Sequence, residues 1–517
     1  MNATRAALIP FLRLGPLLLL HALLREIVPN GLALPEASYQ ARWIVSRLPA
    51  HPYAALLWAG LAFGLPLLAW RRRWSEDDLG RLRWLVVGLA AAVALPLWLA
   101  STNFHSGRFH GADRLLLLAG VGLIALRPAA VGLVLAQGLL LVGQYRYPLG
   151  LYFSWTEARP LWELLLLFVI LLAARSVAQS YRATDFLALA LCQVAAMYFW
   201  AGESKLQTGW LAGERLAHLA AHAFSNGWRP GPYARALDDA AWLDLPLRVL
   251  TLALEMGALL LPLSRRFAPA FLGAAIVFHL GVAALTGSLF WPWIALDVLL
   301  LATIRRLPGD RPAAPLAPRG FAVAVVALAP WIFAPDRFGG MHAPLNVTYE
   351  VEAVGASGRT YPVGRNFFEP FDSLFAEAPF HWLDERPHLT DMLGYTEDRG
   401  VVEALEGAAD ARQTLEIERV RGRIDRDPEA AARFDGLVAR RFGALNAGTL
   451  RWPLPLDPPF PHTLLFTRLS DEYAGQEPVK EVRVHRRSTW HHAGRIELLS
   501  DEVVRSLSIP SAVETSE

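Results

Sequence analysis

Apolar runs of helical length follow one another along the first 335 residues of the chain. Several approach the ~20 residues that a helix needs to cross ~30 Å of hydrocarbon, and shorter runs can gain length from flanking residues or a thinner local bilayer. The pattern predicts a polytopic α-helical membrane bundle of about 10–11 helices. The runs are Ala6–Leu24, Tyr53–Trp70, Trp84–Ala100, Arg114–Leu126, Ala129–Val142, Leu161–Ala174, Thr184–Ala201, Leu247–Leu263, Phe267–Leu285, Leu289–Ile304 and Phe321–Ala334.

The first of these runs leaves two interpretations open. It contains Pro10, Arg13, Pro16 and His21, so it either crosses the membrane or lies in the interface. A cleaved signal peptide is disfavoured, because Arg13 interrupts the apolar segment and no clear small-residue cleavage site follows it.

After Pro335 the pattern becomes that of a water-exposed domain. Asn346–Val363 alternates apolar and polar residues and turns at Gly355–Gly358, which predicts a β-hairpin. Val401–Val420 and Pro428–Leu445 have helical patterns, and the segment "EVRVHRR" predicts a further strand. We therefore expect two domains, a transmembrane domain of residues 1–335 and an extramembrane α+β domain of residues 336–517.

The positions of the arginines predict an orientation. Short loops rich in arginine or lysine face the cytoplasm, and here basic loops alternate with poorly basic ones when every run is counted as a span. The N-terminus is therefore expected in the cytoplasm and the C-terminal domain outside it. The basic loops contain Arg71, Arg72, Arg73, Arg81 and Arg83, then Arg127, then Arg175 and Arg182, then Arg265 and Arg266, then Arg305, Arg306, Arg311 and Arg319.

Composition excludes several classes of protein. With 54% hydrophobic and 19% charged residues, the chain is too apolar for an ordinary soluble enzyme and unlike a disordered or collagen-like protein. A single cysteine, Cys192, excludes an internal disulfide scaffold. The net charge of +2 gives no reason to expect nucleic acid as a partner. Membrane lipid is the partner that the composition predicts.

Common motifs for metal or nucleotide chemistry are missing from the sequence. It contains no H-E-x-x-H, no CxxC, no glycine-rich loop with a Walker lysine and no G-x-S-x-G, so no metal cofactor is predicted. The pair in Trp490-His491-His492 is more typical of a solvated loop than of a ligand set.

One lysine stands out within the stretch Met197–Phe224. All but two of the 49 basic residues are arginine, and Lys205 is the lysine in the membrane half. Arginine can do what lysine does except give up its proton, so a site that needs a neutral amine favours lysine. The alternative is that Lys205 extends to water or pairs with Glu203 at the membrane boundary. Gly202, just before, allows a turn or a close backbone approach.

Three further ionisable residues interrupt apolar runs. Glu255, His279 and Asp297 would each be costly if they faced lipid, so each is expected to face the bundle interior, a cavity or a partner. They either belong to a functional site or form structural hydrogen bonds between helices, such as Glu255 with His279.

The residues from "YFWAGESKLQTGW" to "LEMGALLLPL" and "IVFHLGVAAL" resemble the HTTM (horizontally transferred transmembrane) domain family, which includes the vitamin K-dependent γ-glutamyl carboxylases and their bacterial relatives. The resemblance covers roughly Ala54–Arg306. It implies that Lys205 is the catalytic base that deprotonates a quinol, either reduced vitamin K or another quinol. The residues expected around this cofactor are Tyr198, Gly202, Glu203, Trp210, Glu255 and His279.

The resemblance also implies an activity and a location. A carbon–carbon lyase of this type couples quinol oxidation to carboxylation of glutamate, with a peptide or protein substrate on the external side of a bacterial inner or plasma membrane. The carboxylases carry an Asn-His element before the lysine, whereas the corresponding segment here begins "SWTEARPLWELLLLF". The quinol half of the reaction is therefore the part best matched. The alternative is a non-catalytic membrane protein that binds lipid or a partner through its external domain.

Overall fold

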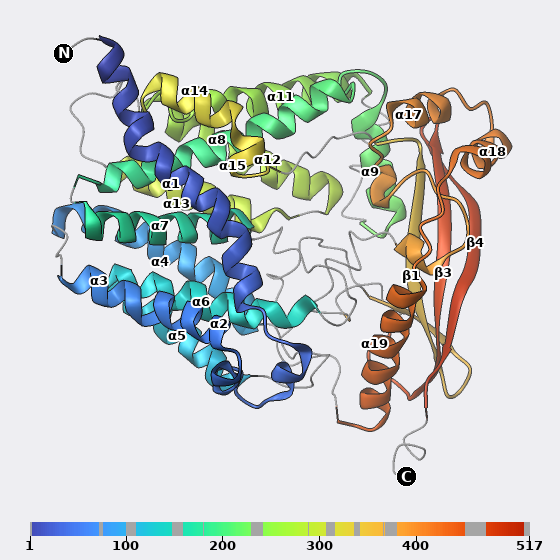
Figure 1. The fold of residues 1–517 in the computed structure, drawn as a ribbon. Helices are drawn as coiled ribbons and strands as arrows, with labels where there is room; N and C mark the ends of the chain where they lie inside the picture. Colours follow the sequence, from blue (N-terminus) through green and yellow to red (C-terminus); the bar gives the residue numbers. More distant parts are fainter. Residues whose placement is uncertain are drawn as a thin grey trace.

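The computed structural model describes residues 3–71, 76–99, 110–146, 159–178, 180–228, 241–287, 289–306, 316–335, 342–364, 367, 380–449 and 472–510. Helices make up the first part of the chain and a four-stranded antiparallel sheet with short helices makes up the last part (Figure 1). The expected boundary at residue 336 lies outside the described residues.

Every apolar run identified in the sequence is helical. Some runs are divided into two helices. Pro52–Arg71 contains a π-helical turn at Gly60–Gly64, and the last run breaks near Leu328. The helices are α1 (Ala3–Leu32), α2 (Pro52–Ala59), α3 (Leu65–Arg71), α4 (Glu76–Leu99), α5 (Gly111–Leu126), α6 (Val131–Val142), α7 (Arg159–Val177), α8 (Ala183–Gln207), α9 (Arg215–Ser225), α11 (Asp244–Gly257), α12 (Phe267–Thr286), α13 (Trp291–Arg306), α14 (Arg319–Ala327) and α15 (Ala329–Ile332).

Four of the described helices are long and apolar enough to cross a membrane. They are the segment Leu8–Leu32 of α1, together with α7, α8 and α12. In α8, 89% of the most apolar window is buried inside the protein, against 22% in α1, so α8 is a central helix and α1 an outer one. Large apolar side chains such as Leu12, Leu19 and Val277 are more than two-thirds exposed on the outer helices, a surface that favours contact with lipid.

The sheet has the strand order β2-β1-β3-β4. The expected hairpin is confirmed as β1 (Leu345–Gly355) and β2 (Thr360–Val363), and the expected strand is confirmed as part of β3 (Val479–His492), which also pairs with β4 (Arg495–Ser508). The two expected helical segments are confirmed as α17 (Arg399–Glu406) with α18 (Ala411–Arg421), and as α19 (Pro428–Asn446).

The helix α9 joins the two parts of the molecule. It lies between the helices and the sheet in Figure 1 and contacts β3 on one side and α11 and α12 on the other. His491 on β3 lies 2.9 Å from His218 on α9, measured between their Nδ1 atoms, and it is buried. The interpretation of His491 as part of a solvated loop is therefore wrong, because the end of β3 is covered by α9.

Candidate functional site

One face of α8 carries the residues expected at the site. Tyr198, Gly202 and Lys205 are spaced four and three residues apart, which places them on the same side of a helix. All three are buried. The helix continues to Gln207 instead of ending at Gly202, so Lys205 belongs to a regular helix and not to a loop at the membrane boundary.

Lys205 is paired with Glu255 on α11. Lys205 Nζ donates to Glu255 Oε1 at 2.7 Å, and the two side chains are 10% and 5% exposed. The other oxygen of the carboxylate, Oε2, is buried and has no hydrogen-bond partner among the described residues. The alternative pairing of Lys205 with Glu203 is wrong, since Glu203 accepts a hydrogen bond from Gln207 one turn further along the helix.

Gly202 permits the close approach that brings this pair together. A Cβ atom at this position would lie 2.9 Å from Glu255 Cβ and 3.1 Å from Met256 Sδ, closer than side chains normally pack. Any larger residue would push α11 away from α8. The close-approach interpretation of Gly202 is therefore confirmed, and the alternative that it turns the chain is wrong.

A second polar group lies two helical turns earlier on the same face of α8. The Tyr198 hydroxyl donates to Asp297 Oδ2 at 2.8 Å and lies 2.7 Å from His279 Nε2. When Tyr198 donates to Asp297, its oxygen accepts the proton of His279 Nε2. His279 therefore pairs with Tyr198, and the suggested pair of Glu255 with His279 is wrong. The three residues come from α8, α12 and α13 and connect these helices.

Trp210 closes the end of the site. Its Nε1 donates to the carbonyl oxygen of Arg248 at 3.1 Å, and Arg248 Nη1 donates back to the Trp210 carbonyl at 2.8 Å. Arg248 is itself paired with Asp244 at 2.6 Å. The indole lies 5.9 Å from Lys205 Nζ, measured to the ring centroid, so the loop after α8 covers the lysine.

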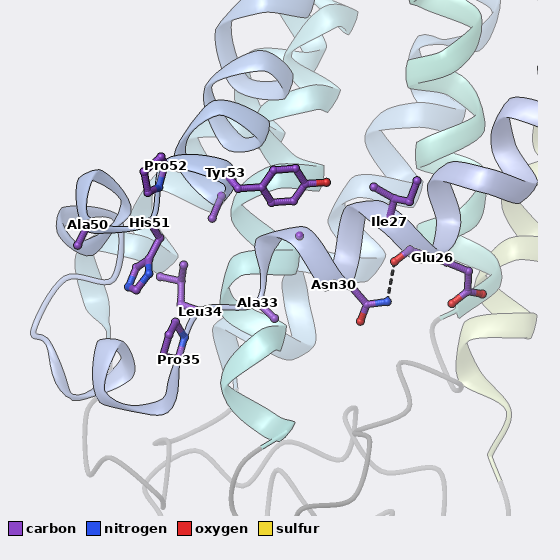
Figure 2. A pocket seen from close by; sticks show the side chains of 12 residues that line it. Glu26, Ile27, Asn30, Ala33, Leu34, Pro35, Ala50, His51, Pro52 and Tyr53 are labelled. Atoms are coloured by element: carbon purple, nitrogen blue, oxygen red, sulfur yellow. Dashed lines mark hydrogen bonds between the residues drawn. The ribbon is translucent and has the colours of Figure 1, made fainter.

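A pocket of about 640 Å³ lies elsewhere, between the end of α1 and the start of α2. Glu26, Asn30, His51 and Tyr53 are among the side chains that line it (Figure 2). Lys205 is not among its lining residues.

Further buried polar residues were not identified as part of a site from the sequence. Glu163 on α7 accepts from Arg159 Nε at 2.9 Å and from Gln193 Nε2 at 2.8 Å, and Asp113 accepts from the backbone of Ile44 at 2.9 Å. The sign of their burial that the sequence offered was their position inside or beside apolar runs. Their partners are distant in the sequence, so no local pattern predicts the pairs.

Two stacked histidines in the part of the chain that contains the sheet were also missed. The rings of His381 and His388 lie 3.4 Å apart, measured between centroids, and nearly parallel. Burial lowers the pKa of His388 to about 4, with His381 and Arg423 acting in the same direction. Burial also lowers the pKa of His381. Both rings are therefore neutral at pH 7 and can offer a lone pair.

These features define a mainly helical protein with helices able to cross a membrane, a buried lysine–glutamate pair between two helices, and a sheet domain joined through α9. Comparison with known protein families, with curated proteins and with solved structures finds no match to this chain.

Proposed function

We propose that this chain is an integral membrane protein of the HTTM type, in which Lys205 and Glu255 act as a base toward a quinol or another lipid-soluble substrate. Its N-terminus is assigned to the cytoplasm and its sheet domain to the external side. The observation that supports this best is the buried pair, with Nζ and Oε1 at 2.7 Å, on the most enclosed membrane-length helix.

The choice of lysine supports a chemical role over a structural one. Other buried ion pairs between carboxylates and basic side chains in the helical part use arginine, as in Arg248–Asp244 and Arg159–Glu163. Arginine suits a permanent pair because it keeps its proton and offers several donors. Lysine at position 205 is the residue type that can release a proton and take one up.

The pair offers a route for one proton. Transfer of a proton from Nζ to Glu255 leaves a neutral amine beside a carboxylic acid, an arrangement that a low-dielectric site tolerates better than an isolated charge. The amine lone pair can then accept the hydroxyl proton of a substrate within hydrogen-bond reach. The unpartnered Oε2 atom of Glu255 can hold or pass on the proton. A quinol supplies the redox chemistry that side chains lack.

We propose that quinol oxidation is coupled to carboxylation of glutamate in a peptide or protein, or to a related reaction. The Asn-His element is missing, so quinol deprotonation is tested first. Membrane lipid is the expected route by which such a substrate reaches α8.

Exchange of each lysine for arginine tests the proposal. Purified protein in nanodiscs is supplied with reduced vitamin K, and quinol oxidation and incorporation of labelled bicarbonate into a glutamate-containing peptide are followed. Lys205→Arg should abolish activity while folding and membrane insertion survive. Lys480→Arg, which changes the exposed lysine on β3, is the matched control and should be fully active. Full activity of Lys205→Arg would show that Lys205 is not a base.

The control variant also gives a direct probe of the site. In Lys480→Arg protein, Lys205 is the sole remaining lysine, so incorporation of ¹⁵N-lysine labels one side chain. Addition of the quinol should move the Nζ resonance. If the resonance stays unchanged at saturating quinol and neither variant turns over substrate, the non-catalytic alternative, binding of lipid or a partner, is the better account.

A further inference from the structure

Three potential metal ligands converge in the external domain, apart from the Lys205 site. They are His381, in the short helix η9 (Phe380–Leu383), His388, and Asp391, which precedes the turn η10 (Met392–Gly394). One ligand atom from each lies within 4.8 Å of the others. Their spacing, His-x6-His-x2-Asp, differs from the common metal motifs, and a metal site here would run against the expectation that no metal is bound.

The backbone holds this segment in place. His388 forms a two-way bridge with Arg423, with both N–H···O distances at 3.0 Å, and Asp391 N donates to Tyr395 O at 2.7 Å. The His381 ring is oriented by Tyr349 of β1, whose hydroxyl lies 3.1 Å from Nδ1. A hydrogen bond at Nδ1 leaves Nε2 as the free ligand atom, which is the usual arrangement for a histidine that binds a metal.

The distances suit a small divalent ion. His381 Nε2 and Asp391 Oδ1 lie 3.3 Å apart. Two ligands at ~2.0–2.1 Å from a tetrahedral zinc ion are separated by about 3.3–3.4 Å. Ligation by His388 as well requires the stacked rings to rotate out of parallel, so that both lone pairs point at the same ion.

The ligand atoms form no hydrogen bonds with the described residues. His381 Nε2, both ring nitrogens of His388 and Asp391 Oδ1 are buried and form no hydrogen bond within the part of the chain that the structure describes. The two histidines are 2% and 1% exposed. Buried polar atoms are nearly always satisfied, and here one unsatisfied ligand atom from each of the three residues lies within reach of a common ion.

Charge at the site is compatible with a cation. Arg423 lies 3.6 Å from Asp391 Oδ1 and 2.9 Å from Asp425 Oδ2, but its side chain is 59% exposed and can turn into solvent. Asp425 Oδ2 lies 3.2 Å from His388 Nε2 and is available as a fourth ligand.

We infer that His381, His388 and Asp391 form a binding site for a divalent transition-metal ion of the zinc type. Mixed imidazole and carboxylate ligands favour zinc and its neighbours over magnesium or calcium, which prefer oxygen ligands throughout. Three protein ligands leave one position for Asp425 or water on the partly exposed side. The ion ties η9 to the segment that precedes η10, and Tyr349 of β1 supports it through His381.

Metal binding by the full-length protein tests this inference. Detergent-solubilised protein is stripped with EDTA, dialysed, and titrated with Zn²⁺ by calorimetry, with Co²⁺ as the spectroscopic probe of coordination. We expect one tight site per chain. His388→Gln and Asp391→Asn should each weaken zinc binding at least 10-fold and abolish the Co²⁺ spectrum of a four-coordinate site.

His485→Gln is the matched control. His485 lies 3.0 Å from Asp501 and 3.8 Å from Glu352 on the exposed face of the sheet, but these residues do not form a ligand cluster in the described part of the chain, so its loss should leave binding unchanged. If His388→Gln does not fold, Asp391→Asn decides, because that carboxylate is partly exposed. The inference is overturned if no stoichiometric zinc binds, or if Asp391→Asn binds zinc as tightly as the unaltered protein. Neither result bears on Lys205.

Discussion

Removal of the Glu255 carboxylate tests the pair at the centre of the helical domain. Glu255→Leu leaves the ammonium group of Lys205 buried between α8 and α11 without the acceptor that now lies at 2.7 Å. Loss of one partner from a buried ion pair costs about 3–5 kcal/mol, because the remaining charge is desolvated without compensation. The side chains of Lys205 and Glu255 are 10% and 5% exposed, so the cost for a buried ion pair applies to them.

Replacement of both partners should behave differently. In Lys205→Met/Glu255→Leu the two charges are removed together, and apolar side chains of similar volume fill the space. Such exchanges are often neutral or stabilising, by ~1–4 kcal/mol. The double variant should therefore be at least as stable as the more stable single variant, with a coupling energy above about 2 kcal/mol.

Unfolding in detergent micelles, followed by tryptophan fluorescence, measures the four free energies of this cycle. Lys205→Met and Glu255→Leu are compared with the double variant under one set of conditions. Additive effects of the single changes, or a Glu255→Leu protein within about 1 kcal/mol of the unaltered chain, would refute the reasoning. The double variant should also be folded and inactive, which separates stability from the proposed chemistry.

Three further outcomes are expected. Gly202→Ala should cost about 1–3 kcal/mol of stability in the same unfolding assay, because its Cβ would meet Glu255, whereas Gly257→Ala on α11, with open space around it, should be neutral or stabilising. Tyr198→Phe should cost about 1–3 kcal/mol, since both hydrogen-bond partners of the hydroxyl stay buried and unpaired. Burial lowers the pKa of His222 to about 3, so stability is fully present above the unfolded value of about 6.5 and falls as the pH drops toward 3. His222 should contribute about 2 kcal/mol to the loss of stability at pH 5, so the loss measured by thermal unfolding should be smaller by about that amount in His222→Gln.

The helices could be predicted from the sequence because apolar periodicity is local. Each run is helical, and the hairpin Asn346–Val363 and the later helices were found from equally local patterns. The ends of the helices were predicted less accurately. The end of α8 lies at Gln207 and not at Ala201, since packing against α11 keeps Gly202 helical where its intrinsic preference is weak.

Pairing within the candidate site could not be predicted in the same way. Lys205 and Glu255 are fifty residues apart and meet because Gly202 allows their helices to touch, which is a property of three-dimensional packing. The sequence identified Lys205, Glu255 and His279 as buried polar residues but assigned the wrong partners. His381 and His388 were overlooked because their ligand geometry is formed by irregular backbone and by Tyr349 of a distant strand.

A reciprocal exchange separates the chemical from the structural role of the basic residue in a buried pair. Arg159 donates to Glu163 at 2.9 Å and to the carbonyl oxygens of Phe333 and Ala334. Lysine carries its donors on a single nitrogen and cannot occupy the positions of both Nε and Nη2, so Arg159→Lys should lose about 1–3 kcal/mol of stability and keep its activity per folded molecule. Lys205→Arg should show the opposite pattern, a small change in stability and no activity. If both variants lose stability but keep their activity, the two pairs have the same structural role, and the lysine at position 205 has no chemical role.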